Sequence, residues 1–298
     1  GQATTTGPQT TTGQATTTGP QTTTGQATTT GLATTTGPEV GGRTRLFQEK
    51  IIDMAVAQSG EILVMKLNPM SLHAVLFDAD FEKLIDFGET DYVRVGTYFE
   101  ESTSNSIFLA SAVRKTYDTL AVSGNYIGSE DLGDPTLAIF DVAILPTEDP
   151  GLNIVVFIDV LTSTLEKFDG IGSVTVHSFN TPIYLAARGN LTVVSDSEDN
   201  IVIGFYIDRF THYEVFRHSV DSLIILKDVC IDSEFNVFIA EYTNSRIVRL
   251  DNSGKILGLI PVAERPIAVA IKRQGVLLVG DEAGCFKYSS KDRKVFVG

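Results

Sequence analysis

The chain has 298 residues and a formal net charge of −14 at pH 7, with 37 Asp and Glu against 23 Lys and Arg. This acidity argues against nucleic acid and anionic membrane surfaces as partners, because both bind basic faces, but it suits divalent cations and basic partners. No apolar run approaches the roughly 18–20 residues of a membrane helix, so we expect no membrane insertion.

The first 36 residues are six hexads of the form Gly-x-x-Thr-Thr-Thr, and residues 1–38 contain no charged side chain. Such a segment buries too little apolar surface to offset its chain entropy, so we expect residues 1–43 to be a disordered, low-complexity arm. Clustered threonines with interspersed proline resemble a mucin-like, O-glycosylated stalk; an unmodified flexible spacer is the alternative. Candidate glycosylation sites in the first three hexads are Thr4, Thr5, Thr6, Thr10, Thr11, Thr12, Thr16, Thr17 and Thr18.

Residues 44–298 differ sharply from the arm, because short β-rich runs with two-residue alternation follow one another between turns. Each unit contains an apolar strand, a turn, a second apolar strand that often ends in an acid, a polar turn and further strands. Six units of about 40 residues predict an all-β, six-bladed β-propeller. The units are residues 51–88, 92–128, 137–170, 182–206, 226–260 and 266–289.

The unit IDSEFNVFIAEYTNSRIVRLDNSGKIL resembles an NHL repeat through Asn236, Ala240-Glu241, Asn244 and Arg246-Ile247. The 182–206 unit is similar, whereas the 266–289 unit keeps only Gly275 and Asp281. The resemblance implies an NHL-like propeller. A WD-type propeller lacks support because the chain has no Trp. We expect the early TRLFQEK segment and the terminal KVFVG to share one blade and close the ring.

Four acids recur at the ends of second strands: Asp159, Asp196, Glu241 and Asp281. Equivalent positions in a propeller form a ring around the axis, where carboxylates could bind calcium. Alternatively, each acid hydrogen-bonds the backbone of a neighbouring turn. The sequence leaves both roles open, and the calcium role is the weaker one.

Other candidate chemistry is sparse. The histidines, His73, His177, His212 and His218, have no metal-ligand spacing, and a zinc site needs three or four convergent ligands. Cys230 and Cys285 are expected to be buried apolar side chains rather than a disulfide. We find no nucleophile elbow, P-loop or dinucleotide motif, and therefore expect no catalytic residue and no cofactor.

The triplet Asn190-Leu191-Thr192 is an N-glycosylation sequon in an expected turn. Together with the Thr-rich arm, it favours a secreted protein of the extracellular matrix.

These features lead us to expect a non-enzymatic extracellular binding or structural module, in a matrix such as that of calcified tissue. Its partners would be other proteins or glycans, with divalent cations as a further possibility. Two alternatives remain open: a calcium-dependent propeller hydrolase or lyase, and the substrate-binding part of an intracellular NHL-type ubiquitin ligase.

Overall fold

A computed structural model describes residues 43–288 except for the short segments 58–59, 69–70, 91, 99–105, 112–115, 122, 124, 133–136, 146, 148–152, 221–223 and 273–274. These residues belong to one unit, Val40–Gly298, and form 24 strands. None of them forms a helix that could cross a membrane. The Thr-rich arm and its candidate glycosylation sites lie outside the described residues.

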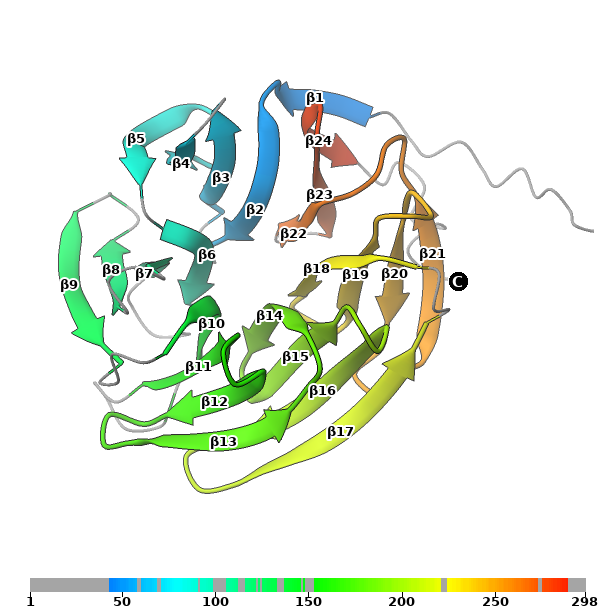
Figure 1. Ribbon diagram of the computed structural model, residues 1–298. Coiled ribbons are helices and arrows are strands. Elements are labelled where there is room, and N and C mark those ends of the chain that lie inside the picture. Colours follow the sequence, from blue (N-terminus) through cyan, green and yellow to red (C-terminus); the bar gives the residue numbers. More distant parts are fainter. Residues whose placement is uncertain are drawn as a thin grey trace, which may run out of the picture. The chain divides into compact units, whose positions relative to one another are not determined.

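The strands form six four-stranded antiparallel sheets, the blades, arranged around one axis (Figure 1). Blades 1 to 3 contain β2 (Lys50–Val56), β3 (Ile62–Asn68), β4 (Ser71–Phe77), β5 (Lys83–Thr90); β6 (Tyr92–Tyr98), β7 (Ser106–Ser111), β8 (Thr116–Ala121), β9 (Tyr126–Asp131); β10 (Ile139–Leu145), β11 (Ile154–Asp159), β12 (Thr164–Phe168) and β13 (Ser173–Ser178). Blades 4 to 6 contain β14 (Pro182–Arg188), β15 (Leu191–Asp196), β16 (Ile201–Ile207), β17 (His212–Ser219); β18 (Leu226–Ile231), β19 (Val237–Glu241), β20 (Arg246–Leu250), β21 (Ile256–Pro261); β22 (Ala268–Lys272), β23 (Val276–Asp281), β24 (Gly284–Tyr288) and β1 (Arg43–Phe47). The predicted all-β propeller is therefore confirmed.

The ring closes through the start of the described chain. Strand β1 pairs with β24, so that Arg43 lies opposite Tyr288 and Phe47 opposite Cys285. The N-terminal strand thus completes the blade that the C-terminal strands begin, which removes an open sheet edge. The TRLF segment lies in the closing blade as expected, whereas KVFVG lies outside the described residues.

The core lies between blades, because both faces of a middle strand are covered by neighbouring sheets. Every residue of β11, β15 and β19 is buried. One apolar cluster joins Val193 and Val202 of blade 4 to Val229 and Val237 of blade 5. The near-continuous apolar runs of the middle strands follow from this two-sided burial.

Aspartates begin several hairpin turns and fix their geometry. Asp251 Oδ1 accepts hydrogen bonds from the N–H groups of Ser253 and Lys255, at 2.9 and 3.0 Å. Gly254 in this turn has a φ of 82°, a conformation that glycine adopts without a steric penalty. In the same kind of turn after Asp232, Phe235 takes a φ of 64°, so the Asx bonds hold a non-glycine residue in the left-handed region.

Candidate functional site: the axial channel

The innermost strands carry a repeated irregularity near their starts. Five of the six, β2, β6, β10, β14 and β18, have a β-bulge at equivalent positions, whereas the register of β22 is regular. A bulge places an extra residue on one strand and redirects its side chain, and bulges often lie next to functional sites. The inner strands of five blades therefore carry an extra residue at an equivalent position near their starts.

The bulge residues whose side chains are described are Ile52, Phe140, Ile183 and Lys227, and we call them the bulge ring. All four are half-buried. An innermost strand is covered on both faces by adjacent blades and on its outer edge by the second strand. Ile52, Phe140 and Ile183 pack against three of the buried apolar clusters. None of the four bulge residues belongs to the lining of the axial cavity, so the bulge ring lies beside the channel, near the starts of the inner strands.

A second ring lies three residues further along each of these strands. It consists of Ala55, Ala143, Ala186 and Cys230, which we call the alanine ring. These half-buried residues line a cavity of about 90 Å³ at the axis. At about 3.3 Å per residue, the two rings lie roughly 10 Å apart along the strands. The bulge ring consists of large apolar side chains and one cation, whereas the alanine ring consists of small side chains around a cavity that Asp53, Asp141 and Asp228 also line.

Buried aspartates hold these strands to one another. Asp141 Oδ1 accepts the Val142 N–H, and its Oδ2 accepts the Leu185 N–H of the next blade, both at 2.8 Å. Asp228 repeats the arrangement with Val229 at 2.8 Å and with Val269 of blade 6 at 2.7 Å. Each carboxylate therefore joins its own inner strand to the next blade's inner strand.

Blade 1 begins the same arrangement with Asp53. This residue is 5% exposed, and its Oδ1 accepts the Met54 N–H at 2.8 Å. The three aspartates line the cavity but come from alternate blades. Both carboxylate oxygens of Asp141 and Asp228 already accept backbone N–H groups, so these acids stabilise the channel wall.

The acids that the sequence analysis proposed for calcium lie in separate turns. Asp159 Oδ1 accepts N–H groups from Ala138 and Leu161, at 3.0 and 3.1 Å. The Oδ2 of Asp196 accepts those of Asn180 and Thr181, at 2.8 and 3.1 Å. The backbone hydrogen-bonding role therefore accounts for both residues.

Glu241 and Asp281 are likewise engaged within their own turns. Glu241 Oε2 accepts hydrogen bonds from Asn244 Nδ2, at 3.0 Å, and from Arg246 Nε. Asp281 Oδ1 accepts the Ala283 N–H at 2.7 Å. Across the described part of the chain, no group of three or more His, Cys, Asp and Glu side chains could hold a metal ion. The four acids therefore lie in four different blades, and each hydrogen-bonds groups of its own blade.

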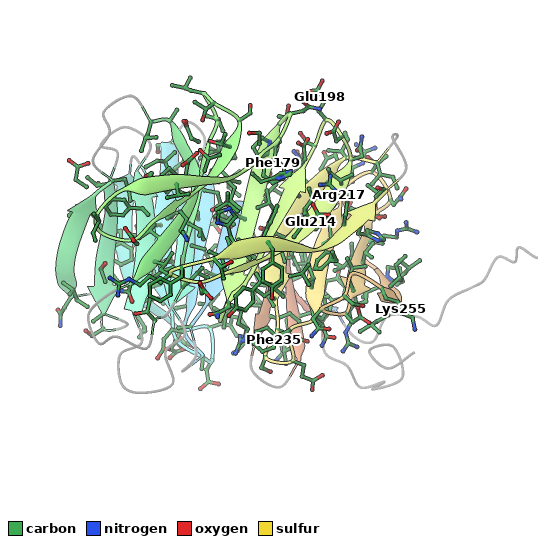
Figure 2. The ribbon with its side chains drawn as sticks, turned by 90° about the horizontal axis from the view of Figure 1, so that it is seen from below. Phe179, Glu198, Glu214, Arg217, Phe235 and Lys255 are labelled. Atoms are coloured by element: carbon green, nitrogen blue, oxygen red, sulfur yellow. The ribbon has the colours of Figure 1, made fainter. Side chains whose placement is uncertain are left out.

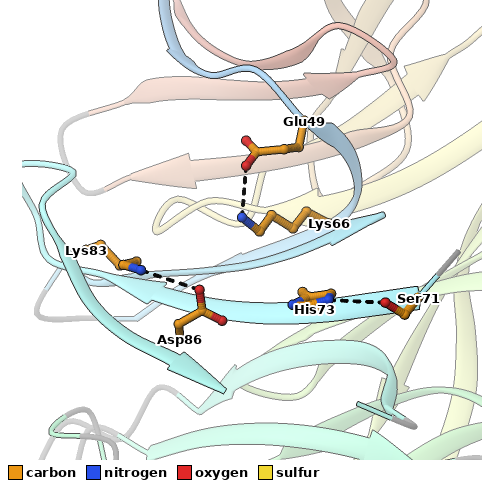
Figure 3. A network of polar contacts seen from close by, with 6 residues as sticks. All are labelled: Glu49, Lys66, Ser71, His73, Lys83 and Asp86. Atoms are coloured by element: carbon orange, nitrogen blue, oxygen red, sulfur yellow. Dashed lines mark hydrogen bonds and ion pairs between the residues drawn. The ribbon is translucent and has the colours of Figure 1, made fainter. Parts of the chain in front are cut away.

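The histidines are not brought together. His73 on β4 contacts Ser71 Oγ at 3.1 Å, and Figure 3 shows this pair beside the separate Glu49–Lys66 and Lys83–Asp86 contacts of blade 1. His212, His218 and His177 lie on the outer strands β17 and β13. Burial lowers the pKa of His177, with a further contribution from the charge of Arg217, and burial also lowers the pKa of His218.

Both cysteines are free thiols. Cys285 is fully buried, and burial raises its pKa to about 12. Cys230 lines the axial cavity, where burial raises its pKa well above the usual value and the charge of Asp228 adds to the effect. Neither thiol is an activated nucleophile.

The sequon asparagine has a partner of its own. Asn190 is half-buried, and its Nδ2, the atom that an N-linked glycan would modify, donates a hydrogen bond to Tyr206 Oη at 2.8 Å. The phenol of Tyr206 in turn stacks on Tyr213, with ring centroids 5.0 Å apart. Modification of Asn190 would require this hydrogen bond to break.

Three solved structures illustrate what the propeller resembles. A gluconolactonase from Xanthomonas campestris has a TM-score of 0.61 at 11% identity, covering 82% of this chain and 88% of that one. A calcium-binding protein, regucalcin, from Agrobacterium tumefaciens has 0.58 at 12%, covering 84% and 94%. A streptogramin B lyase has 0.57 at 9%, covering 83% and 96%. No family model and no curated protein sequence matches the chain.

These likenesses establish the fold. They also overturn our expectation of a non-enzymatic module, because two of these structures are named as enzymes and the third as a calcium-binding protein. That expectation came from the absence of a catalytic sequence motif, but side chains from distant blades can form a site that no local motif marks.

The sequence analysis missed the bulge ring. The signal was present as a recurring element in three first strands: IIDMAV, FDVAI and KDVCI, each with Asp53, Asp141 or Asp228 directly after the bulge residue. Aligning first strands rather than second strands would have found it. The bulge itself is a property of strand pairing, so sequence alternation alone did not predict it.

Proposed function

We propose that this propeller is a hydrolase or lyase that acts on a small molecule at the end of its axis where the bulge ring lies. The bulge ring carries the proposal, because the inner strands of five blades have a bulge at equivalent positions and bulges often lie next to functional sites. Small-molecule sites are typically concave and mostly apolar, with a few placed polar groups. Ile52, Phe140 and Ile183 are half-buried apolar side chains at this end of the inner strands, and the half-buried Lys227 is the polar group of the set.

The fold likeness supports a reaction class of cyclic-ester hydrolysis or elimination. One neighbour is named a gluconolactonase and another a streptogramin B lyase. We therefore take lactones as the first substrates to test. In lactone hydrolysis, water adds to the carbonyl carbon, the acyl C–O bond breaks, the ring oxygen gains a proton, and the released acid ionises to a carboxylate.

We test whether the activity needs calcium, but we give calcium no role in the proposed reaction. Regucalcin is named as a calcium-binding protein, but in the described part of this chain no three His, Cys, Asp or Glu side chains gather where they could hold a metal ion. We assign no step to a metal. Each assay is run with added calcium and with a chelator, so that a metal requirement would be detected directly.

The test is turnover of a lactone panel, including gluconolactone, and of quinupristin, the compound present in one lyase structure. Acid release and substrate loss are followed together.

The variant Ile183→Trp fills the bulge ring and should lower kcat/KM at least about tenfold, because the substrate loses its place at the axis. The matched control is Val215→Trp on outer strand β17, where the side chain is 43% exposed, and it should keep wild-type turnover. Full activity in Ile183→Trp, or no turnover of any panel member with or without calcium, would contradict the proposal.

The setting of the protein is a further part of the proposal. We place the protein outside the cell, with an NHL-like propeller behind an O-glycosylated arm, and the Thr-rich hexads of residues 1–36 support this. Protein or glycan partners would contact the arm or the loops. Intact mass of the native protein tests this setting: a heterogeneous excess removed by O-glycan cleavage supports it, whereas the bare polypeptide mass contradicts it.

A further inference from the structure

Aromatic side chains of blades 4 and 5 border one turn at the end of the propeller where the inner strands end. The rings of Tyr206 and Tyr213 stack across β16 and β17, with centroids 5.0 Å apart and an interplanar angle of 14°. Tyr206 is half-buried, whereas Tyr213 is 55% exposed. Because Tyr206 covers one face of the Tyr213 ring, the exposed surface of Tyr213 includes the other face of that ring.

The β14–β15 turn connects this pair to blade 5. Asn190 Nδ2 in the turn donates a hydrogen bond to Tyr206 Oη at 2.8 Å. The preceding residue, Gly189, lies against the ring of Phe235, because a Cβ at this glycine would be only 3.3 Å from Phe235 Cε1. Phe235 is 38% exposed. Tyr206, Tyr213 and Phe235 therefore surround one two-residue turn, and we call them the aromatic cluster.

The aromatic cluster lies at the opposite end of the molecule from the bulge ring. The turn that it surrounds follows the last residue of β14, whereas the bulge of β14 is near the start of the strand. Figure 2 shows Phe235 at one end of the propeller and Glu198, from the β15–β16 turn, at the other. The aromatic cluster is therefore separate from the site of the proposed reaction.

Hydrogen bonds hold the rings of the cluster in place. The turn that carries Phe235 is fixed by Asp232 Oδ1, which accepts the N–H groups of Glu234 and Asn236 at 2.8 and 2.9 Å. Tyr206 is fixed by its bond from the Asn190 side chain. Rings that are positioned before a ligand arrives lose little conformational entropy on binding.

The acids beside the cluster in sequence are already engaged. Glu214 forms an ion pair with Arg217 at 2.7 Å. Asp208 Oδ1 accepts the N–H groups of Phe210 and Thr211 at 2.8 and 2.7 Å. A ligand at this surface therefore meets aromatic rings and engaged charges, which suits a neutral molecule. Single-stranded nucleic acid also stacks on aromatic rings, but a chain of net charge −14 repels its phosphates.

We propose that the aromatic cluster binds the sugar rings of a neutral glycan built from β-1,4-linked glucose-type units. Equatorial substituents leave C–H groups on both faces of such a ring and place its hydroxyls around the rim. The C–H face packs on the electron-rich face of an aromatic ring, and the exposed face of Tyr213 supplies that surface. The tyrosine hydroxyl and the Asn190 amide supply hydrogen-bonding groups for the rim. This inference does not depend on turnover at the bulge ring.

The test is calorimetric titration of the full chain with cellohexaose and with chitohexaose. The two probes share the ring geometry, and their relative affinities distinguish a cellulose-type from a chitin-type ligand. Tyr213→Ala and Phe235→Ala should each weaken binding of the preferred probe about tenfold, because each removes a stacking face. Tyr213→Phe should keep the affinity within about threefold, because it retains the aromatic ring.

Two further variants serve as controls. Leu161→Ala removes an apolar side chain that is 72% exposed in the β11–β12 turn, at the other end of the propeller, and should bind the glycan as wild type does. Ile183→Trp should likewise leave glycan binding unchanged, whatever it does to lactone turnover, so the two proposals fail separately.

Four outcomes would overturn the glycan surface. They are binding of neither hexasaccharide, binding of a polyproline peptide in their place, equal losses in Tyr213→Ala and Leu161→Ala, and loss of glycan binding in Ile183→Trp. The second outcome would identify a peptide groove, because aromatic-lined surfaces also bind proline-rich segments.

Discussion

The bulge ring and the alanine ring belong to the same inner strands and differ in the size and polarity of their side chains. The bulge ring holds Ile52, Phe140, Ile183 and Lys227, whereas the alanine ring holds small side chains around a cavity of about 90 Å³. Six regular strands with large side chains at the axis would crowd one another. A bulge turns the strand locally and makes room for larger, chemically distinct residues.

The comparison shows that the same inner strand, repeated in each blade, can both narrow the channel and supply varied residues for binding. Small side chains let the inner strands approach closely at the alanine ring, and the aspartates fasten adjacent blades between the rings. Variation at the bulge residue then changes the site without altering the fold. Four variants or labels test this division of roles.

The largest effect on stability is expected from Asp228→Ala, which removes the carboxylate that joins the inner strands of blades 5 and 6. It leaves the buried N–H groups of Val229 and Val269 without their partner, and each orphaned group costs about 1–3 kcal/mol. We expect a loss of about 3 kcal/mol in the free energy of unfolding, measured by denaturant titration. Asp208→Ala removes a similar pair of bonds in an exposed turn and should cost clearly less. Equal losses would show that the inner strands need no carboxylate.

The next largest effect is expected from Ala143→Leu, which enlarges a side chain of the alanine ring. Ala143→Leu overpacks the alanine ring and should cost about 1–2 kcal/mol, a typical penalty for added methylenes in a packed region. Turnover should stay within about twofold of wild type, because the chemistry is assigned to the bulge ring. Ile183→Leu, the volume-conserving change in the bulge ring, should cost less than about 1 kcal/mol. Loss of turnover in Ala143→Leu would move the site to the alanine ring.

A smaller effect concerns the thiols. Cys230 lines the channel but has a raised pKa, so iodoacetamide should label it slowly at neutral pH and faster as the pH increases. Cys285, with a pKa of about 12 and no exposed surface, should remain unlabelled until the protein unfolds. Peptide mass spectrometry distinguishes the two sites. Rapid labelling of Cys285 in the folded protein would contradict the burial of the blade 6 core.

The smallest effect lies outside the channel, at the Glu49–Lys66 pair of blade 1 (Figure 3). The hydrogen bond from Lys66 lowers the pKa of Glu49. A lowered folded-state pKa stabilises the protein above the unfolded value, near 4.3, and this stabilisation is lost as the pH falls through the folded value. Glu49 is partly exposed, so Glu49→Gln should cost less than about 0.5 kcal/mol at pH 7 and nothing once the carboxyl is protonated. A loss that persists at low pH would contradict the ionic origin.

Much of the fold could be predicted from the sequence, because the apolar residues of the blade core follow a two-residue alternation within each strand. The alternation of Val229 and Ile231, and then of Val237 and Ile239, marks two adjacent strands, and its recurrence marks the repeat. Closure by β1 followed from the need to cover a sheet edge. The weakest repeat, residues 92–128, still forms a complete blade of four strands, because its neighbours constrain it.

The site could be predicted less well. The second-strand acids recur more visibly than the bulge residues, and recurrence drew attention to Asp196 and Glu241. Their carboxylates serve the local turns, a role that depends on the exact approach of N–H groups. The bulge residues come from different blades, and only strand pairing in the assembled sheets shows that they occupy equivalent positions.

The central claim is that ligands bind at the bulge ring. It is tested most directly by a crystal structure of the protein with a lactam analogue of the lactone that it hydrolyses fastest. The account predicts that the lactam lies across the axis against Ile52, Phe140 and Ile183, with its polar end toward Lys227. A lactam bound at the alanine ring or on the outer strands, with the bulge ring unaltered, would contradict it.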